Sequence, residues 1–361
     1  MTRVALLAPC TWPEVRRGGE RLVRELASGL IERGHQPTLI TSHPGQPSRT
    51  VEDGLEVIRN WRPPDGRLRR RLVEDYVTHV PFSYKHLNRG DYEIAHAFHA
   101  PDALAAVRWS RNTDRPAVFT FLGLPTRRNL VQRRGRLEAV VKAADGSAAV
   151  VALSKAAREG FRHELGIEAR VIHPGVDLDR FQPTTGRDER PTIFCASDPA
   201  VEAKRVPLLI EAFKRVRKRR RRARLILQAP RDEALAATLA DPDNGIELTR
   251  GDNLPELYSS AWTLALPSWG EAFGLVLTEA LACGTPVVGT NDEVIDSDGI
   301  GRVFTGDDPK DLAKALFECL ELANDPNTRE RCRARAKDFS TGKATDAYLQ
   351  LYEEVTVNGE R

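Results

Sequence analysis

The sequence has few of the residues that build disulfide frameworks and metal sites. Its cysteines are odd in number and widely scattered, and no CxxC pair or cysteine–histidine cluster occurs among them. Neither a disulfide framework nor a zinc site is predicted, and we expect no bound metal. The five cysteines are Cys10, Cys195, Cys283, Cys319 and Cys332.

Long apolar runs and a large excess of one charge are also missing. No stretch approaches the roughly 18 apolar residues of a membrane span. Met1 leads straight into the strand-like segment RVALLAP, without the charged and then apolar pattern of a signal peptide. The formal net charge of +3 gives no reason to expect nucleic acid as the main partner. These absences favour a soluble cytoplasmic protein.

Apolar strand-like runs alternate with helical patterns along the 361 residues, which predicts an α/β protein with parallel sheets covered on both faces. A segment rich in proline, glycine and charge, residues 173–191, reads as a linker between two halves. We therefore expect two Rossmann-like domains, 1–182 and 183–342, and a final helix at 343–361 whose apolar face needs a partner. The expected strands are Val4–Ala8, Thr38–Thr41, Glu56–Arg59, Ile94–Phe98, Val118–Leu122, Ala149–Leu153, Arg170–His173, Thr192–Ala196, Arg224–Gln228, Gly245–Thr249, Trp262–Pro267 and Pro286–Gly289.

The most informative segment is PSWGEAFGLVLTEALACGT, from Pro267 to Thr285. An apolar run that predicts a strand precedes it, and an apolar helical pattern follows the turn. The turn places free N–H groups of a helix start beside Glu271 and Gly274, and such a helix start favours an anion. Glu279 lies farther along the helix, within reach of a group attached to that anion. The layout fits a diphosphate between a sugar and a ribose; an ordinary strand–turn–helix with two solvated glutamates is the alternative.

The phrase PSWGEAFGLVLTEALACGTPVV resembles the hallmark of the GT-B glycosyltransferases, in particular the retaining family 4 (group 1) enzymes. In that hallmark, seven residues separate two glutamates. The resemblance implies two domains that face a central cleft, and a last helix that crosses back to the first domain. It also implies that Glu271 faces the donor sugar, that the amides of Phe273, Gly274 and Leu275 hold the diphosphate, and that Glu279 binds the ribose hydroxyls.

Two further segments carry the resemblance. PEVRRGGERLVRELASGLIERGH resembles the family's glycine pair and first helix, so that Gly18 and Gly19 would let backbone approach the donor diphosphate or the acceptor. A plain turn into the helix is the alternative for this pair. KRVPLLIEAFKRV resembles the first helix of the second domain, where a lysine and an earlier arginine hold the donor phosphates. Lys204 matches that lysine.

The sequence departs from the family at the arginine, because Ser197 and Asp198 stand near its expected place. Arg205 occupies a position that the family usually gives to glycine, and we expect it to supply the second positive charge on the diphosphate. A solvated Arg205 at the helix start is the alternative. A cation pair on a leaving diphosphate would stabilise the charge that develops as the glycosidic bond breaks.

The family's histidines are also altered. In AHAFHAP, His96 fits the first histidine of the pattern, Phe98 replaces the second, and the adjacent His99 could substitute for it. In TFLG, Leu122 stands where a histidine is usual. His96 and His99 are therefore candidate sugar contacts, with satisfied core histidines as the alternative for both.

The sequence contains three dense basic runs, which allow more than one interpretation. They most simply form solvated surfaces, with peripheral attachment to an anionic membrane as the next alternative. Nucleic acid comes last, because no aromatic residues interleave with the charges and no binding motif is present. The runs are Arg67–Arg71, Arg127–Arg136 and Lys214–Arg224.

The resemblance as a whole implies a metal-independent, retaining transferase that moves a sugar from a nucleotide diphosphate donor to an acceptor hydroxyl. The nucleotide sugar would be a co-substrate, and no resident cofactor is expected. The acceptor would be a glycan, a lipid-linked molecule or a small molecule, met in the cytoplasm or at the inner face of the membrane. A sugar-nucleotide epimerase and a catalytically silent homologue that serves as a binding or scaffold subunit are the alternatives. The missing arginine and the two altered histidine positions favour the silent homologue, whereas the intact Glu271, Gly274, Glu279 and Lys204 favour the enzyme.

Overall fold

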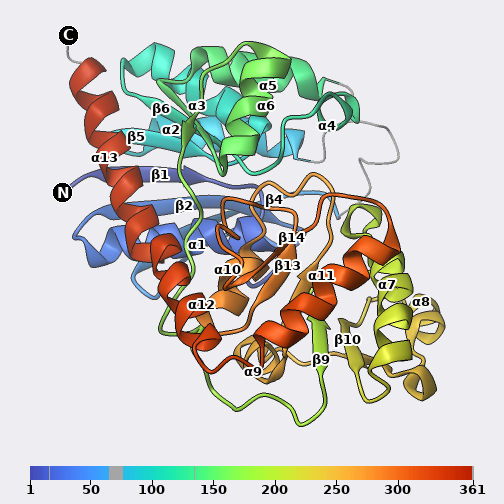
Figure 1. Cartoon of the computed structure of the whole chain (residues 1–361). Coiled ribbons are helices and arrows are strands. Elements are labelled where there is room, and N and C mark those ends of the chain that lie inside the picture. The colour runs from blue at the N-terminus through green and yellow to red at the C-terminus, as the bar shows by residue number, and fades with distance from the viewer. Residues whose placement is uncertain (16, 65–75, 134, 360–361) are drawn as a thin grey trace. The chain divides into compact units, whose positions relative to one another are not determined.

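The protein folds into two compact α/β units, seen in a computed structural model that describes residues 1–15, 17–64, 76–133 and 135–359 (Figure 1). One unit comprises Met1–Gly175 and Thr341–Arg361, and the other comprises Val176–Ser340. The chain thus passes between units earlier than the expected 182/183 boundary. Each unit is built on a mainly parallel sheet, which confirms the predicted pair of Rossmann-like domains. The basic run Arg67–Arg71 lies outside the described residues.

The first unit contains an eight-stranded sheet in the order β3-β4-β2-β1-β5-β6-β7-β8. Every neighbouring pair is parallel except β3 and β4, which form an antiparallel hairpin. Asp53 and Gly54 turn this hairpin with positive φ angles, as an Asp-Gly pair commonly does. The strands are β1 (Arg3–Leu7), β2 (Gln36–His43), β3 (Ser48–Glu52), β4 (Leu55–Trp61), β5 (Ile94–Ala97), β6 (Ala117–Phe121), β7 (Ala149–Ala152) and β8 (Arg170–Val171).

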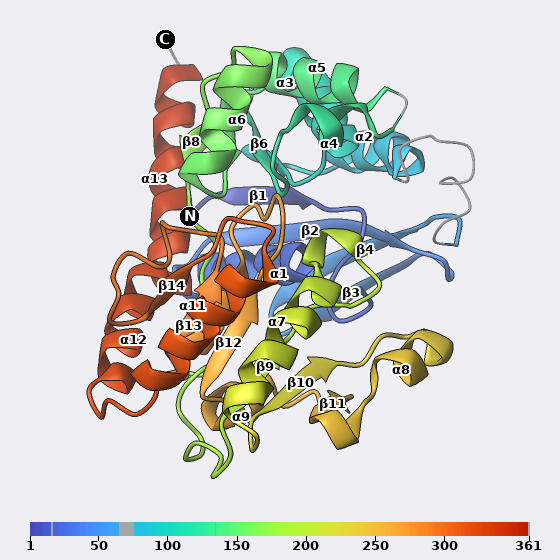
Figure 2. The ribbon, with the colours of Figure 1, turned by 45° about the vertical axis from the view of Figure 1, so that its right-hand side comes forward.

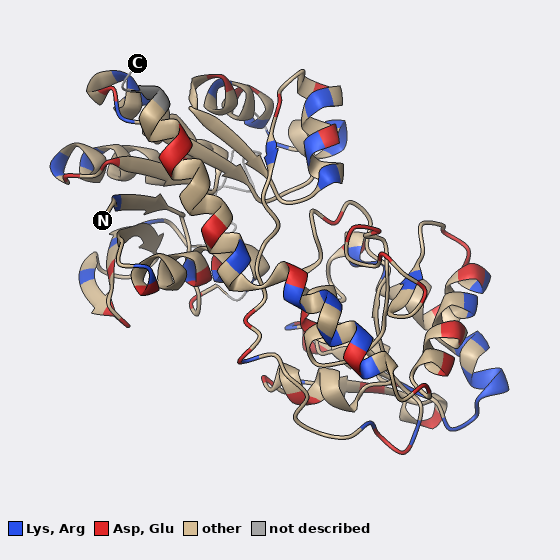
Figure 3. Ribbon diagram, turned by 60° about the vertical axis from the view of Figure 1, so that its left-hand side comes forward, with Lys and Arg blue, Asp and Glu red and all other residues tan. Residues whose placement is uncertain are grey.

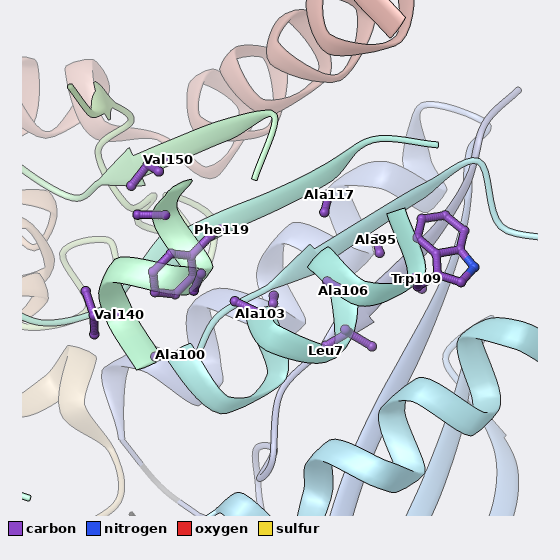
Figure 4. Packing of buried hydrophobic residues seen from close by; sticks show 14 of the residues in the cluster. Leu7, Ala95, Ala100, Ala103, Ala106, Trp109, Ala117, Phe119, Val140 and Val150 are labelled. Atoms are coloured by element: carbon purple, nitrogen blue, oxygen red, sulfur yellow. The ribbon is translucent and has the colours of Figure 1, made fainter. Parts of the chain in front are cut away.

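Small residues let a helix lie close to this sheet. Ala103 and Ala106 of α3 pack in one buried cluster with Ala95 and Ala117 of the strands, and Trp109 fills the space at the end of the helix (Figure 4). The helices of this unit are α1 (Gly18–Glu32), η2 (Val77–His79), α2 (Val80–Arg89), α3 (Ala100–Thr113), α4 (Arg127–Val131), α5 (Arg136–Gly146), α6 (Lys155–Leu165) and α13 (Thr341–Gly359).

The last helix, α13, belongs to the first unit, as predicted. Its residues Tyr348, Leu351 and Tyr352 are buried. Gly29 of α1 faces Thr345 so closely that an added Cβ would lie 2.3 Å from the threonine hydroxyl oxygen. The glycine therefore permits the close packing of α1 against α13, and burial of the apolar face fixes the end of the chain on this unit.

The second unit contains a six-stranded, fully parallel sheet in the order β11-β10-β9-β12-β13-β14 (Figure 2). Leu209, Phe213 and Val216 of α7 and Leu316 of α11 lie in its buried core. The strands are β9 (Thr192–Cys195), β10 (Arg224–Gln228), β11 (Ile246–Thr249), β12 (Thr263–Leu266), β13 (Val287–Gly289) and β14 (Gly301–Val303). The helices are η3 (Glu202–Lys204), α7 (Val206–Arg219), α8 (Glu233–Leu239), η4 (Pro242–Asn244), α9 (Leu254–Ser260), α10 (Leu275–Ala282), α11 (Pro309–Leu322), α12 (Thr328–Ala336) and η5 (Lys337–Phe339).

The strand order of the second unit indicates where this unit is suited to bind a ligand. β9 lies between β10 and β12, so the chain leaves it toward opposite sides of the sheet in its successive crossovers. In open parallel sheets, ligands bind outside the carboxyl ends of the strands at such a switch point. The segments that follow β9 and β12 contain Lys204 and Glu271 respectively, and the site is therefore expected there.

Candidate functional site

The site is built on the turn between β12 and α10. Gly274 precedes the helix with φ of 88° and ψ of 60°, a left-handed conformation that favours glycine. A Cβ at this position would lie 3.0 Å from Leu266 Cδ2 and 3.3 Å from Leu277 Cδ1. Both backbone conformation and space therefore select glycine here.

The start of α10 presents backbone N–H groups. The first amide of the helix with a backbone acceptor is that of Leu277, which donates to the Gly274 carbonyl at 2.8 Å. Leu275 and Val276 precede it, are half-buried, and have no backbone acceptor for their N–H groups within the part of the chain that the structure describes. Unpaired amides and the helix dipole together make this end favourable for an anion.

Packing around Phe273 holds the turn. The Phe273 ring is buried and lies edge-on to Phe339, with ring centroids 5.4 Å apart. Its carbonyl oxygen accepts a hydrogen bond from the side-chain amide of Asn291 at 2.7 Å. The residue that the sequence suggested as a diphosphate contact thus has an apolar side chain in the core, and only its backbone could face a ligand.

Lys204 and Glu271 meet beside this helix start. The ammonium nitrogen of Lys204 lies 2.5 Å from Glu271 Oε2, although 67 positions separate them in the sequence. Their side chains are 29% and 20% exposed, so both remain accessible to a ligand. The arrangement gives one cation and one hydrogen-bond acceptor next to free backbone donors, which suits a phosphate linked to a hydroxylated group.

Glu279 lies in the same helix and is almost fully buried, with 1% of its surface exposed. The Tyr258 hydroxyl, from α9, donates to Glu279 Oε2 at 2.8 Å. This partner was missed at the sequence level, because Tyr258 fits the apolar pattern of its helix and nothing in the pattern indicates a role for its hydroxyl. The predicted contact of Glu279 with a ribose stays a prediction.

The structure places Arg205 in a setting that differs from the expected phosphate contact. Its side chain is only 6% exposed and donates to the carbonyl oxygen of Pro267 and, at 3.0 Å, to that of Gly306. Nη1 also donates to Asp307 at 2.6 Å. Burial lowers the pKa of the guanidinium, and the nearby Asp307 carboxylate opposes this shift. Its charge is therefore already paired within the protein.

His96 lies in the core of the first unit. Its ring is fully buried on β5, with Nδ1 2.6 Å from the Tyr352 hydroxyl and Nε2 2.7 Å from the Thr120 hydroxyl. Burial lowers its pKa to about 3. The structure thus favours the alternative of a satisfied core histidine, and a sugar contact of His96 stays a prediction.

The other predicted residues of the first unit lie near the carboxyl ends of β1 and β5. His99 precedes α3 and is half-buried, with its ring edge-on to Tyr76 at a centroid distance of 5.5 Å. Gly18 and Gly19 begin α1. A Cβ on Gly19 would lie 2.8 Å from Leu122 Cδ1, so this glycine accommodates the leucine that replaces the family's histidine. Ligand contacts of His99, Gly18 and Gly19 stay predictions.

The described residues provide neither a metal-binding cluster nor a membrane-spanning helix. Within residues 1–15, 17–64, 76–133 and 135–359, no three His, Cys, Asp or Glu side chains gather in a group that could hold a metal ion. Among the helices of the same residues, none combines the length and the apolar character needed to cross a bilayer.

Comparison with known proteins agrees with this architecture. Residues 16–180 match the model of Glycosyltransferase Family 4, and residues 190–322 match that of Glycosyl transferases group 1. A D-inositol 3-phosphate glycosyltransferase of Paenarthrobacter aurescens is 28% identical over 92% of this chain and 91% of its own length. The enzyme of the same name from Saccharomonospora viridis is 32% identical, but that match spans only about half of each protein.

Solved structures share the fold. Sucrose-phosphate synthase from Thermosynechococcus elongatus has a TM-score of 0.80 and 18% identity, covering 99% of this chain and 100% of the other. Anabaena Alr3699/HepE in complex with UDP-glucose has a TM-score of 0.76 and 17% identity, covering 98% and 100%. The two α/β units, with the anion-favouring turn in the second, are those of a GT-B glycosyltransferase. The chain belongs to glycosyltransferase family 4, the group 1 glycosyl transferases.

Proposed function

We propose that this protein is a retaining, metal-independent glycosyltransferase that uses a nucleotide diphosphate sugar as co-substrate. The observation that carries the proposal is the Lys204–Glu271 pair beside the free amides that begin α10. Lys204 and the helix start would neutralise the departing diphosphate, and Glu271 would accept hydrogen bonds from the donor sugar. Chemistry of this kind needs no metal ion, because the protein itself supplies the positive charge.

The relatives suggest which substrates to test first. HepE was solved with UDP-glucose, and the Paenarthrobacter relative is named for D-inositol 3-phosphate. We therefore propose a UDP-sugar as the first donor and a phosphorylated polyol as the first acceptor to assay. Resemblance to the family supports a same-face reaction in which the departing phosphate takes the proton of the acceptor hydroxyl.

A thermal-shift screen against UDP-, GDP-, ADP- and TDP-sugars tests donor binding, since a ligand that binds only the folded state raises the melting temperature. The Lys204→Ala variant provides the site control, and its shift should be smaller. Transfer assays with and without EDTA test the metal independence, and NMR of the anomeric proton tests retention. Turnover that stops on chelation and returns with Mg²⁺ would contradict the metal-independent mechanism. Selective binding without transfer to any acceptor would favour the silent homologue.

We also propose peripheral contact with an anionic membrane. Arg215, Lys218, Arg221 and Arg222 are exposed near the end of α7, and none forms an ion pair with a described residue. Elsewhere, basic and acidic residues lie side by side on many helices (Figure 3). Unpaired cations near an anionic surface contribute about 1 kcal/mol each. Cosedimentation with phosphatidylglycerol vesicles, but not with phosphatidylcholine vesicles, should detect the contact and should weaken with salt.

A further inference from the structure

We propose that Arg205 is a positioning residue, which holds the Glu271 segment in register with Lys204, and that it does not bind the donor diphosphate. This inference rests on the proposed function. It replaces the expectation that Arg205 substitutes for the missing family arginine.

Three consecutive residues tie the end of η3 to the segment that follows β12. The Ala203 carbonyl accepts the Trp269 backbone N–H at 2.8 Å, and Lys204 pairs with Glu271 at 2.5 Å. Arg205 Nε donates to the Pro267 carbonyl. Because three neighbouring residues contact Pro267, Trp269 and Glu271, they fix the position of the segment that carries Glu271.

Arg205 also contacts a third segment, the one that follows β14. Its guanidinium lies against the ring of Trp269, 5.0 Å from the centroid, and against that of Phe304 at 5.5 Å. Asp307 accepts from both Arg205 Nη1, at 2.6 Å, and the Trp269 indole N–H, at 3.2 Å. Arg205 therefore joins the segments after β12 and β14 into one wall of the site.

The same contacts leave the guanidinium unsuited to a phosphate. Nε and Nη1 already have acceptors within the protein, and the Asp307 carboxylate pairs with the guanidinium charge. The backbone of Arg205 has φ of 51°, a left-handed conformation that is unfavourable for a residue with a Cβ. Glycine would avoid that cost, so the side-chain contacts are the physical reason for an arginine at this position.

The positioning role predicts a specific pattern of kinetic changes. Arg205→Gly removes the side chain without adding backbone strain, and Asp307→Ala removes its partner. Each variant should lower kcat by roughly 10- to 100-fold, the scale expected when a reacting group is misplaced by about 1 Å. The affinity for free UDP should stay within about twofold, because Lys204 and the α10 start remain. The double variant should be little worse than Arg205→Gly, because the Arg205–Asp307 contact is already lost in that single variant.

The experiment compares these variants with wild type by calorimetric titration of UDP, or of the diphosphate that the thermal-shift screen selects, and by initial rates with the matching sugar nucleotide. Arg250→Ala is the control, because Arg250 is an exposed cation of the same unit that pairs with Glu233. If Arg205 instead holds the diphosphate, Arg205→Gly weakens UDP binding tenfold or more while Asp307→Ala leaves binding and kcat intact. That result, or an unchanged kcat in Arg205→Gly, overturns the proposal.

A separate readout does not depend on activity. Quenching of Trp269 fluorescence by neutral acrylamide, obtained by subtracting the Trp269→Phe signal, should increase in both Arg205→Gly and Asp307→Ala. The indole loses the guanidinium that lies against its ring in the first variant and its hydrogen-bond acceptor in the second. A wild-type protein that neither binds a nucleotide diphosphate nor transfers sugar contradicts the proposed function, whereas unchanged quenching contradicts the positioning role. If Arg205→Gly does not fold, Asp307→Asn carries the same comparison, because it removes the charge and keeps the shape.

Discussion

The imidazole of His96 on β5 bonds the Tyr352 hydroxyl of α13 at 2.6 Å, across 256 positions of the sequence. A second hydroxyl, that of Thr120 on β6, lies 2.7 Å from the other ring nitrogen. Either hydroxyl can donate or accept, so burial of the ring, and not these two contacts, disfavours the charged imidazolium. His96 thus holds the final helix on the first unit, and its ionisation opposes the fold.

Lowering the pH should therefore destabilise the protein through His96. Its folded pKa of about 3 lies below the ordinary value of 6.5, so the unfolded chain binds a proton that the folded chain excludes between these values. The stabilising contribution is present above pH 6.5 and is lost as the pH falls toward 3, by up to about 1.4 kcal/mol per pH unit. Urea unfolding at several pH values measures this slope. The wild type should lose more stability than His96→Gln over the range, whereas exposed His163→Gln should follow the wild type; parallel curves for wild type and His96→Gln would contradict the assignment.

Gly274→Ala should cost both stability and nucleotide affinity. The left-handed backbone alone costs an alanine roughly 1–2 kcal/mol, and the added Cβ also meets Leu266 at 3.0 Å. Gly166→Ala is the matched control, since Gly166 has φ of 66° and open space around it. We expect Gly274→Ala to unfold at lower urea concentration than Gly166→Ala and, unlike it, to bind UDP more weakly. Equal effects of the two substitutions on both measurements would exclude a special role for the turn.

Glu279→Ala should weaken binding of the free nucleoside diphosphate by roughly 10- to 100-fold, the range of a hydrogen bond to a charged group, with little change in sugar preference. Tyr258→Phe removes only the hydroxyl that bonds Glu279 Oε2, and its effect should be smaller. Calorimetric titration of both variants measures the difference. Unchanged affinity in Glu279→Ala would remove this residue from the ribose role.

Lys204→Ala should reduce kcat/KM by about 10²-fold, as expected on loss of one preorganised group that stabilises developing charge. Lys214→Ala is the matched control, because Lys214 is a half-exposed lysine of α7 that pairs with Glu211 outside the site. Initial rates with the cognate donor compare the two variants. If Lys204→Ala were as active as the control, Lys204 would have no role in catalysis, and the backbone amides alone would stabilise the diphosphate.

The α/β class, the two domains and the turn at Gly274 could be predicted from the sequence. Apolar runs such as 4–8 and 192–196 become buried strands, because a parallel sheet covered on both faces needs nearly continuous apolar residues. The strands β3 and β14 were missed, since Ser48–Glu52 is almost wholly exposed and Gly301–Val303 is too short to form a pattern. The sequence also predicted a turn at Gly274. This was possible because a turn that leads into a helix restricts the backbone angles of a single residue, which is a local property.

Which polar side chains are accessible to a ligand could not be predicted from the sequence, because it depends on contacts between distant segments. His96 and His99 look alike in AHAFHAP, but α13, from the far end of the chain, covers the first and converts it into a core residue. Arg205 looks like a free cation beside Lys204 until Asp307, 102 positions away, pairs with it. Local sequence fixes backbone geometry through sterics and hydrogen bonding, whereas burial and charge pairing depend on segments that only folding brings together.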